Sequence, residues 1–376
     1  MRPGKRLLIS LVLGVLLVGP GWGNAHDVTG VAVQTSDPVF VGAGDITNCR
    51  RDGDDATAKL LDGIEGTVFT LGDNAYPDGT LDQYKNCYDP TWGRHKSRTM
   101  PAPGNHDYHT TGAEGYFSYF GAAASPSEAG CTSDCKGYYS YDLGAWHIIV
   151  INSEIDISAG SPQEQWLRTD LETHPAACTL AYWHEPRFNS GKHGNAKSTG
   201  PLWQALYEYH ADVVLNGHDH NYQRFALQNP QGQADPEGIR EFVVGTGGAG
   251  LYGFTTNQPN TEIRDNSTTG VLKLTLHDTS YDWEFIPVPG GTFTDSGTAD
   301  CVGEGNTAPP APPPATASAP TGTPVVSTTG TAISTTPTVP ATPTVFLTPE
   351  TPPAPAPEPS FFKRIIAWFI SLFSGG

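Results

Sequence analysis

The sequence has few basic residues and few methionines for its length. Of 376 residues, 21 are lysine or arginine against 39 aspartate or glutamate, so the formal net charge is −18. Such a chain repels the phosphates of nucleic acid at long range, and we expect no binding to duplex DNA or RNA. An anionic substrate would need a local, strongly positive group to hold it. The count of two methionines suits an oxidising compartment, where methionine is vulnerable.

Long apolar runs are also missing. The two most apolar segments lie near the ends of the chain, and each is shorter than the ~20 residues that cross a bilayer. The first, residues 7–18, follows three basic residues and leads through small residues to Ala25. This layout is typical of a secretory signal peptide over residues 1–25; a membrane anchor is the alternative, which the length disfavours.

The C-terminal part of the chain has a different composition. Residues 307–359 consist largely of proline, threonine, alanine, serine and valine, which predicts a disordered, extended linker. Residues 360–376 are short and apolar, with Lys363 and Arg364 near the start. As a helix this segment would lie in a membrane surface; self-association or docking on a protein is the alternative. We therefore expect a secreted or cell-surface protein, with membrane-surface contact through residues 360–376.

Six cysteines, an even number, fit an exported protein with disulfide bonds. Their spacing matches no zinc-ribbon pattern. One hypothesis pairs the ends of a short loop, ties the end of the domain to a strand and joins the remaining two: Cys131–Cys135, Cys178–Cys301 and Cys49–Cys87. Six cysteines permit many other pairings, which stay open at this point.

The remaining residues, 26–306, are enough for one large domain. Short apolar runs rich in β-branched residues alternate with helical patterns, which predicts a layered α/β fold. The predicted strands are 38–45, 67–73, 146–153, 179–184, 212–217 and 241–248. The predicted helices are 54–64, 161–174 and 201–210, and residues 271–288 are typical of a β-hairpin.

Polar residues stand at the ends of these runs. In open α/β sheets, ligands bind at the carboxyl ends of the strands. The oxygen and imidazole donors found there suit iron, zinc or manganese. Because positions i and i+2 of an extended chain face the same side, we expect His218 and His220 to face one shared object. The residues concerned are Asp45, Asp73 to Tyr76, Asn105 to Asp107, His184, His218 and His220.

Each of these residues has an ordinary explanation by itself, as a helix cap, a turn residue or a hydrogen-bonded histidine. Five motifs in order are more specific: Gly42-x-Gly44-Asp45, Gly72-Asp73-Asn74-x-Tyr76, Gly104-Asn105-His106-Asp107, Trp183-His184-x-Pro186 and Gly217-His218-x-His220. With this combination the chain resembles the metallophosphoesterase (calcineurin-like) superfamily over nearly all of residues 38–301. Most members have Asp-x-His at the first motif, where this chain has Asp45-Ile46-Thr47. Tyr76, three residues after Asp73, makes it similar to the purple acid phosphatase-like branch.

The resemblance implies a four-layer α/β/β/α metallophosphoesterase sandwich with two mixed β-sheets and a pair of metal ions. The first ion would be held by Asp45, Asp73, Tyr76 and His220, and the second by Asp73, Asn105, His184 and His218, with Asp73 as the bridge. A phenolate is a hard, anionic donor, so we expect Fe(III) at the Tyr76 position and iron, zinc or manganese at the other.

The implied activity is hydrolysis of phosphate monoesters, as in an acid phosphatase. Two cations would attract the phosphate to an otherwise acidic protein, and metal-bound hydroxide would attack the phosphorus. A phosphodiesterase or nucleotidase on the same metals is the nearest alternative. A non-catalytic cell-surface binding protein is the alternative from another class, and the presence of every implied ligand disfavours it.

Three further residues receive catalytic roles from the resemblance. His106 would face the phosphate and stabilise its charge or protonate the leaving oxygen, and Asp107 would orient His106. His193 would contact the phosphate or the leaving group; a solvated loop histidine is the alternative. Residues 245–250 match GxGxxG after a strand, but no helical pattern follows, so we expect a glycine-rich loop near the metals rather than a nucleotide site.

Overall fold

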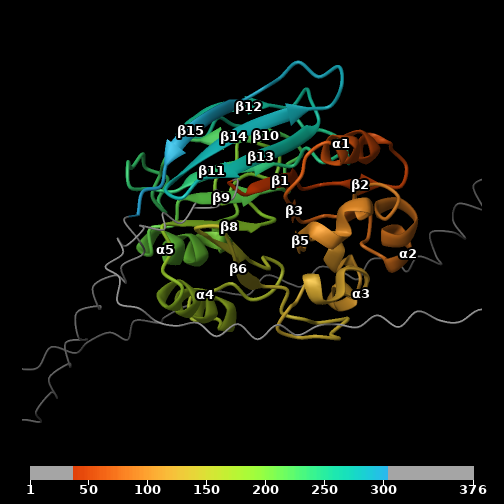
Figure 1. Ribbon diagram of the computed structural model, residues 1–376, viewed down its shortest axis with the longest axis horizontal. Helices are drawn as coiled ribbons and strands as arrows, with labels where there is room; N and C mark the ends of the chain where they lie inside the picture. Colours follow the sequence, from red (N-terminus) through yellow and green to blue (C-terminus); the bar gives the residue numbers. More distant parts are fainter. Residues whose placement is uncertain (1–36, 304–376) are drawn as a thin grey trace, which may run out of the picture. The chain divides into compact units, whose positions relative to one another are not determined.

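Two mixed β-sheets pack face to face in the computed structural model, which describes residues 37–303 (Figure 1). The predicted signal peptide, the proline-rich linker and the C-terminal apolar segment lie outside the described residues. The predicted domain of residues 26–306 is thus described from residue 37 to residue 303.

The first sheet, called sheet 1, has six strands in the order β15-β14-β13-β1-β3-β5. Strands β1, β3 and β5 run parallel, while β13, β14 and β15 are added antiparallel. Phe40 of β1 pairs with Thr67 on one side and with Leu274 on the other. The strands are β1 (Val39–Ala43), β3 (Thr67–Leu71), β5 (Thr99–Ala102), β13 (Gly270–Leu276), β14 (Ser280–Pro287) and β15 (Ser296–Asp300).

The second sheet, called sheet 2, has seven strands in the order β12-β10-β11-β9-β8-β7-β6. Its central strands β7, β8, β9 and β11 are parallel, and the others are antiparallel. The strands are β6 (Tyr139–Leu143), β7 (Trp146–Val150), β8 (Cys178–Trp183), β9 (Val213–Asn216), β10 (Tyr222–Phe225), β11 (Arg240–Val244) and β12 (Thr261–Asp265). A two-stranded parallel pair joins β2 (Thr47–Asn48) to β4 (Ala75–Tyr76).

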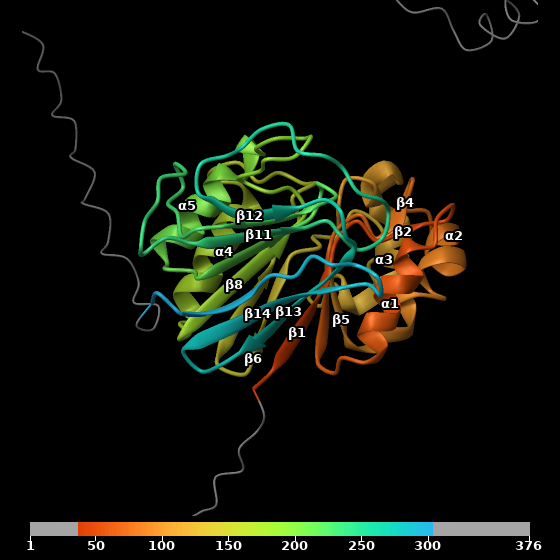
Figure 2. The ribbon, with the colours of Figure 1, turned by 90° about the horizontal axis from the view of Figure 1, so that it is seen from above.

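Helices cover the outer faces of the sheets. Figure 2 shows α4 and α5 on one side, and α1, α2 and α3 on the other. Helix α4 begins where expected: Pro162 is its first residue, and the Ser161 hydroxyl accepts a hydrogen bond from the Glu164 N–H. The helices are α1 (Gly53–Asp62), α2 (Leu81–Gln83), α3 (Glu114–Phe120), α4 (Pro162–Thr173) and α5 (Gly200–Glu208). A single π-helical turn is η1 (Tyr84–Tyr88), and short 3₁₀ turns are η2 (Trp92–Arg98), η3 (Asp107–His109), η4 (Thr111–Ala113), η5 (Gly121–Ala123) and η6 (Lys197–Thr199).

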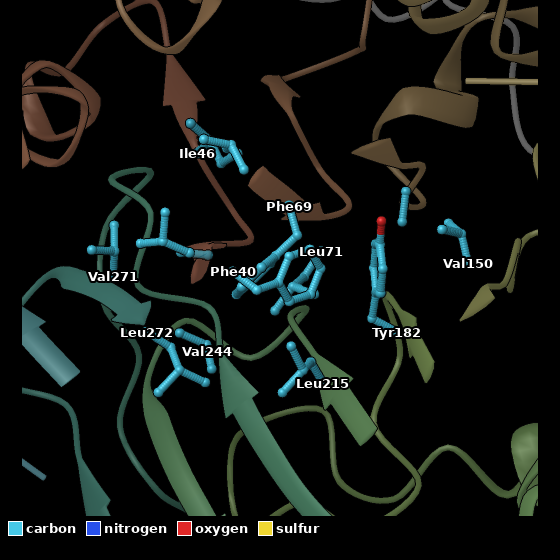
Figure 3. Close-up of a cluster of buried hydrophobic side chains, with 14 of the residues drawn as sticks. Phe40, Ile46, Phe69, Leu71, Val150, Tyr182, Leu215, Val244, Val271 and Leu272 are labelled. Carbon is cyan, nitrogen blue, oxygen red and sulfur yellow. The ribbon is translucent and has the colours of Figure 1, made fainter. Parts of the chain in front are cut away.

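Aromatic side chains fill the space between the two sheets. Phe40 and Phe69 of sheet 1 meet Tyr182 of sheet 2, with ring centroids 4.6 Å apart for the two phenylalanines and 5.7 Å apart for Phe40 and Tyr182 (Figure 3). All three are fully buried. Burying a side chain of this size contributes about 1.5–3 kcal/mol, so this layer holds the two sheets together. A second apolar cluster lies between sheet 2 and helices α4 and α5.

The predicted α/β/β/α sandwich is confirmed, and each predicted strand and helix is present with its ends moved by at most four residues. The hairpin expected over 271–288 is β13 and β14. The hypothesis for the disulfide bonds is also confirmed: the pairs are Cys49–Cys87, Cys131–Cys135 and Cys178–Cys301. Within residues 37–303, no helix has the length and hydropathy needed to cross a membrane.

Candidate metal centre

The polar residues that follow the strands come together where the ends of both sheets meet. The carboxylates of Asp45 and Asp73 and the imidazole of His184 offer ligand atoms within 4.8 Å of one another. A backbone hydrogen bond from Gly217 to the His184 carbonyl, 3.0 Å long, joins the ends of β8 and β9. The predicted ligands stand at or just after β1, β3, β4, β5, β8 and β9: Asp45, Asp73, Tyr76, Asn105, His184, His218 and His220.

The Tyr76 hydroxyl is the most crowded atom of this group. Its oxygen lies 2.7 Å from Asp45 Oδ1, 2.7 Å from Asp73 Oδ2 and 2.9 Å from His220 Nε2. A phenol has one proton and can donate to only one of these acceptors. The remaining lone pairs face each other in a buried place, which is unfavourable unless a cation lies among them.

Two buried imidazoles also turn a ring nitrogen towards these carboxylates, and although burial opposes their charge, the carboxylates raise the pKa of both rings. His184 Nδ1 lies 2.7 Å from the last carbonyl of β3, and His220 Nδ1 lies 2.8 Å from the Gly250 carbonyl. A carbonyl only accepts, so Nδ1 carries the proton in each ring. When these rings are neutral, Nε2 of His184 therefore turns its lone pair towards Asp73 at 3.3 Å, and that of His220 turns towards Asp45 at 3.2 Å. Metal-binding histidines are commonly held in the same way, with the N–H of the non-ligating ring nitrogen donating to a carbonyl.

The other predicted ligands add two more donors. His218 Nδ1 lies 3.2 Å from His184 Nε2, and the His218 backbone N–H donates to Asp45 Oδ2 at 2.8 Å. The side-chain oxygen of Asn105 is buried and has no hydrogen-bond partner among the described residues. A buried amide oxygen without a partner is costly, and a metal ion would satisfy it. The residues present therefore fit a metal pair.

The backbone at the site differs from the extended chain that we expected around His218. Strand β9 ends at Asn216, and His218 has a φ of 69°. The two histidines therefore do not alternate along a strand; the chain bends between them, and each reaches different partners. Asp45 and Asp73 also have positive φ, 59° and 51°. Left-handed backbone is strained for these residues and tends to occur at functional sites.

Burial and neighbouring charges shift the ionisation of these groups. Burial, reinforced by the carboxylates of Asp45 and Asp73, raises the pKa of the Tyr76 phenol well above its usual value. Burial and the neighbouring His184 lower the pKa of His218 to about 4. Burial opposes the charge on Asp73, yet His184 and His106 lower the pKa of this carboxyl. The site thus keeps its carboxylates ionised, and a phenolate would form only beside a cation.

His106 lies at the edge of this group, but Asp107 does not orient it. The backbone N–H of His106 donates to Asp73 Oδ1 at 2.8 Å, and the ring Nε2 of His106 is 3.9 Å from Asp73 Oδ2. Its Nδ1 is 2.6 Å from the Pro77 carbonyl. The Asp107 carboxylate instead accepts hydrogen bonds from the Tyr84 hydroxyl, Asn74 and Gly104.

Our expectation that Asp107 orients His106 is therefore wrong, because the Asp107 carboxylate is fully buried and hydrogen-bonded to other residues. Burial, with Asp73 nearby, raises the pKa of Asp107 to about 6. The Pro77 carbonyl takes the place that we had assigned to Asp107.

His193 is brought to the site from a distant loop. Its ring centroid lies 4.3 Å from that of His218. The His193 side chain is 34% exposed, so the ring borders both the predicted metal ligands and the solvent. The structure thus places the His193 ring beside the predicted ligands, with part of it open to the solvent.

Sequence reasoning missed three residues at this site: Asp219, Lys192 and Tyr252. Tyr252 stacks on His220 with centroids 3.9 Å apart, and the Lys192 ammonium lies 4.7 Å from the Tyr252 ring. Asp219 lies inside the motif between the two histidines and is fully buried. Its place in the motif was a signal, whereas nothing in the local sequence pointed to Lys192 or Tyr252.

The glycine-rich loop over residues 245–250 lies against the site, as expected. A Cβ atom on Gly245 would come within 2.2 Å of the Asp219 carbonyl and 2.7 Å of Asp45 Oδ2. Only glycine allows this approach. The Gly250 carbonyl is the acceptor for His220, so the loop supports the ligands.

Comparison with known proteins places these features in a family. The family model for calcineurin-like phosphoesterases matches residues 33–222, half of the chain. Purple acid phosphatase 15 of Arabidopsis thaliana is 27% identical over 226 residues, which are 52% of this chain and 42% of that protein. The nucleotide pyrophosphatase/phosphodiesterase of Hordeum vulgare is 27% identical over 307 residues, 68% of this chain and 81% of that protein. Relatives from Arabidopsis thaliana named as probable inactive purple acid phosphatases match as well.

The fold agrees with a solved relative. The structure of a purple acid phosphatase from yellow lupin (Lupinus luteus) seeds superimposes with a TM-score of 0.58 at 21% identity, over 71% of this chain and 54% of that chain. The chain spans less than half the length of the first Arabidopsis relatives that it matches. With the five motifs assembled at one site and half of the sequence matched, the chain belongs to the calcineurin-like phosphoesterase family, in its purple acid phosphatase-like branch.

Proposed function

We propose that this protein is a metal-dependent phosphohydrolase that cleaves phosphate monoesters. The observation that carries the proposal is the donor set around Asp73: seven side chains of metal-binding type at one place, with the Tyr76 oxygen within 2.9 Å of two carboxylate oxygens and an imidazole nitrogen. A protein that had lost the reaction would be expected to have lost one of these donors.

The metals would occupy two neighbouring positions with Asp73 shared between them. Asp45, Tyr76 and His220 would complete the first position, and Asn105, His184 and His218 the second. A metal pair activates water as a nucleophile and polarises the phosphoryl oxygen. The phenol oxygen favours Fe(III) at the first position, because hard anionic donors suit hard cations; iron, zinc or manganese would suit the second.

His106 would act on the leaving oxygen. With its Nδ1 proton donated to the Pro77 carbonyl, the ring is held in place and its Nε2 faces the metal centre. In the protonated ring Nε2 carries the proton that the leaving oxygen needs. His193, on the opposite loop, would contact the phosphoryl oxygens beside His218.

A phosphodiesterase or nucleotide pyrophosphatase is the second candidate. The match with the Hordeum vulgare protein of that name covers 81% of that protein's length. The match with purple acid phosphatase 15 of Arabidopsis thaliana covers only 42% of that protein. A non-catalytic role is the third candidate, because some relatives are named as inactive.

Hydrolysis of p-nitrophenyl phosphate and of bis(p-nitrophenyl) phosphate by the metal-replete protein separates the three candidates. Asp73→Asn is the blank, and Asp235→Asn, a residue bonded to Tyr207, is the matched control. Faster cleavage of the monoester, abolished in the blank alone, supports the phosphatase. Faster cleavage of the diester supports the second candidate, and no turnover of either ester supports a binding protein.

We also propose that the protein is secreted and held at a membrane surface by residues 360–376. The support is the sequence of both ends. N-terminal sequencing of protein from the culture medium should begin near residue 26. Flotation with liposomes should require residues 360–376; equal flotation of the truncated protein would end the proposal.

A further inference from the structure

Asp219 lies between the two histidines of the last motif and binds a loop from elsewhere in the chain. It is fully buried. Its carboxylate accepts hydrogen bonds from the backbone N–H groups of Lys192, at 2.9 Å, and His193, at 3.1 Å. It also accepts one from the side-chain amide of Asn189. The His193 ring Nδ1 lies 3.4 Å from the same carboxylate. One side chain thus fixes both the backbone and the ring of His193.

The loop is shaped for this contact at Gly191. A Cβ atom at this position would come within 2.5 Å of Cγ of Asp219 and 2.7 Å of both carboxylate oxygens. Real Cβ atoms do not approach so closely, so any other residue would push the loop away from the carboxylate. Gly191 and Asp219 therefore determine together how near residues 191–193 come to the metal centre.

The segment carries two side chains that face the ligands. The His193 ring lies beside His218, with centroids 4.3 Å apart. The Lys192 ammonium lies over Tyr252, whose other neighbour is the stacked ring of His220. One basic side chain therefore stands near each histidine of the motif. In a chain with 39 acidic and 21 basic residues, Lys192 brings a positive charge and His193 a hydrogen-bonding ring to the border of the site.

We propose that Asp219 is a positioning residue, which holds residues 191–193 against the metal centre so that His193 and Lys192 receive the phosphoryl group. The inference rests on the proposed phosphohydrolase function and adds a residue to it. Asp219 contacts neither substrate nor metal in this scheme; it acts through His193 and Lys192. A purely structural carboxylate is the competing explanation, and the two differ in how mutations combine.

A double-mutant cycle on the full-length, metal-replete protein tests this. Asp219→Asn and His193→Asn are each expected to lower kcat/KM for p-nitrophenyl phosphate by about 10- to 100-fold. The kcat/KM of the double variant should be no lower than that of the less active single variant, because both substitutions remove the same contact. Binding of inorganic phosphate, measured by calorimetry, should weaken in the same non-additive way. Metal content should stay at the wild-type value.

A buried carboxylate elsewhere provides the matched control. Asp295 accepts hydrogen bonds from Tyr222, Arg224 and Trp283, so Asp295→Asn should lower Tm without changing kcat/KM. If Asp219→Asn loses metal or fails to fold, Gly191→Ala takes its place. This variant keeps the carboxylate but displaces the loop, and it should also be non-additive with His193→Asn.

The outcomes separate this inference from the function on which it rests. Effects of the two substitutions that multiply, or an Asp219→Asn variant with wild-type kinetics, would overturn the positioning role while leaving the phosphohydrolase in place. A wild-type protein that contains metal but cleaves no phosphate ester would overturn both.

Discussion

The Tyr76 hydroxyl oxygen lies 2.7 Å from Oδ1 of Asp45, 31 residues earlier in the chain. Tyr76 is the last residue of β4, and Asp45 stands between β1 and β2, the strand that pairs with β4. Asp45 lacks a histidine two residues later, since Thr47 stands there. The Thr47 hydroxyl donates instead to Asp54 Oδ2 at 3.0 Å, and the Tyr76 phenol contacts the Asp45 carboxylate.

Tyr76→Phe should weaken metal binding at the first position. The substitution removes one donor and leaves the ring in place, so we expect metal affinity to fall at least ~10-fold and any visible charge-transfer absorption to disappear. Metal analysis and absorption spectra of the purified protein check this. Tyr252→Phe, which keeps the stacking on His220, is the control. Unchanged colour and metal content in Tyr76→Phe would contradict the assignment.

His106→Asn should affect esters according to their leaving groups. If His106 protonates the leaving oxygen, cleavage of phenyl phosphate should fall about 10²–10⁴-fold. The loss for p-nitrophenyl phosphate should be smaller, because its leaving group needs no proton. His109→Asn is a close control, since this ring lies 4.6 Å from His106 and also contacts the Pro77 carbonyl. Equal losses for both esters would rule out the proton-transfer role.

His147 should make the folded protein less stable as the pH rises. This buried ring lies 2.8 Å from Asp170 and 3.0 Å from Asp142. Burial opposes its charge, but these two carboxylates raise its pKa above the usual 6.5. The folded state then holds its proton more tightly than the unfolded state, so the stabilisation is complete below pH 6.5 and is lost as the pH rises through the higher folded-state pKa.

Thermal unfolding at a series of pH values measures this effect. Tm of the wild type should fall more steeply above pH 6.5 than Tm of His147→Gln. His210→Asn, at an exposed position after α5, should behave as the wild type does. Parallel curves for the wild type and His147→Gln would show that the ring adds no pH dependence.

The three disulfide bonds should contribute unequally to stability. Cys178–Cys301 closes a loop with a sequence separation of 123, whereas Cys131–Cys135 closes one of 4. Because a longer loop restricts the unfolded chain more, replacing the first pair by serine should cost about 2–5 kcal/mol and replacing the second pair should cost less. Denaturant unfolding of the two double variants measures the difference, and a larger loss for the short loop would contradict it.

The sequence was enough to predict the sheets and the gathering of the candidate ligands at the strand ends, because both depend on local patterns. A short apolar run predicts a strand, and each candidate ligand follows its strand within a few residues, as Asp45 follows β1. Contacts between distant loops carry no such pattern. Hence the Pro77 carbonyl on His106, the stacking of Tyr252 on His220 and the bend at His218 were not predicted. Each depends on how the loops pack once the sheets are in place.

The proposed ligands belong to both sheets, and this gives the aromatic layer between the sheets a second role. Asp45, Asp73 and Asn105 move with sheet 1, while His184, His218 and His220 move with sheet 2. The thickness of the layer around Phe40 and Tyr182 would therefore set the distance between the two groups of proposed ligands. A cavity or an extra methyl group in that layer would change metal affinity and turnover without touching a ligand, so the mutational sensitivity of catalysis should extend deep into the hydrophobic interior.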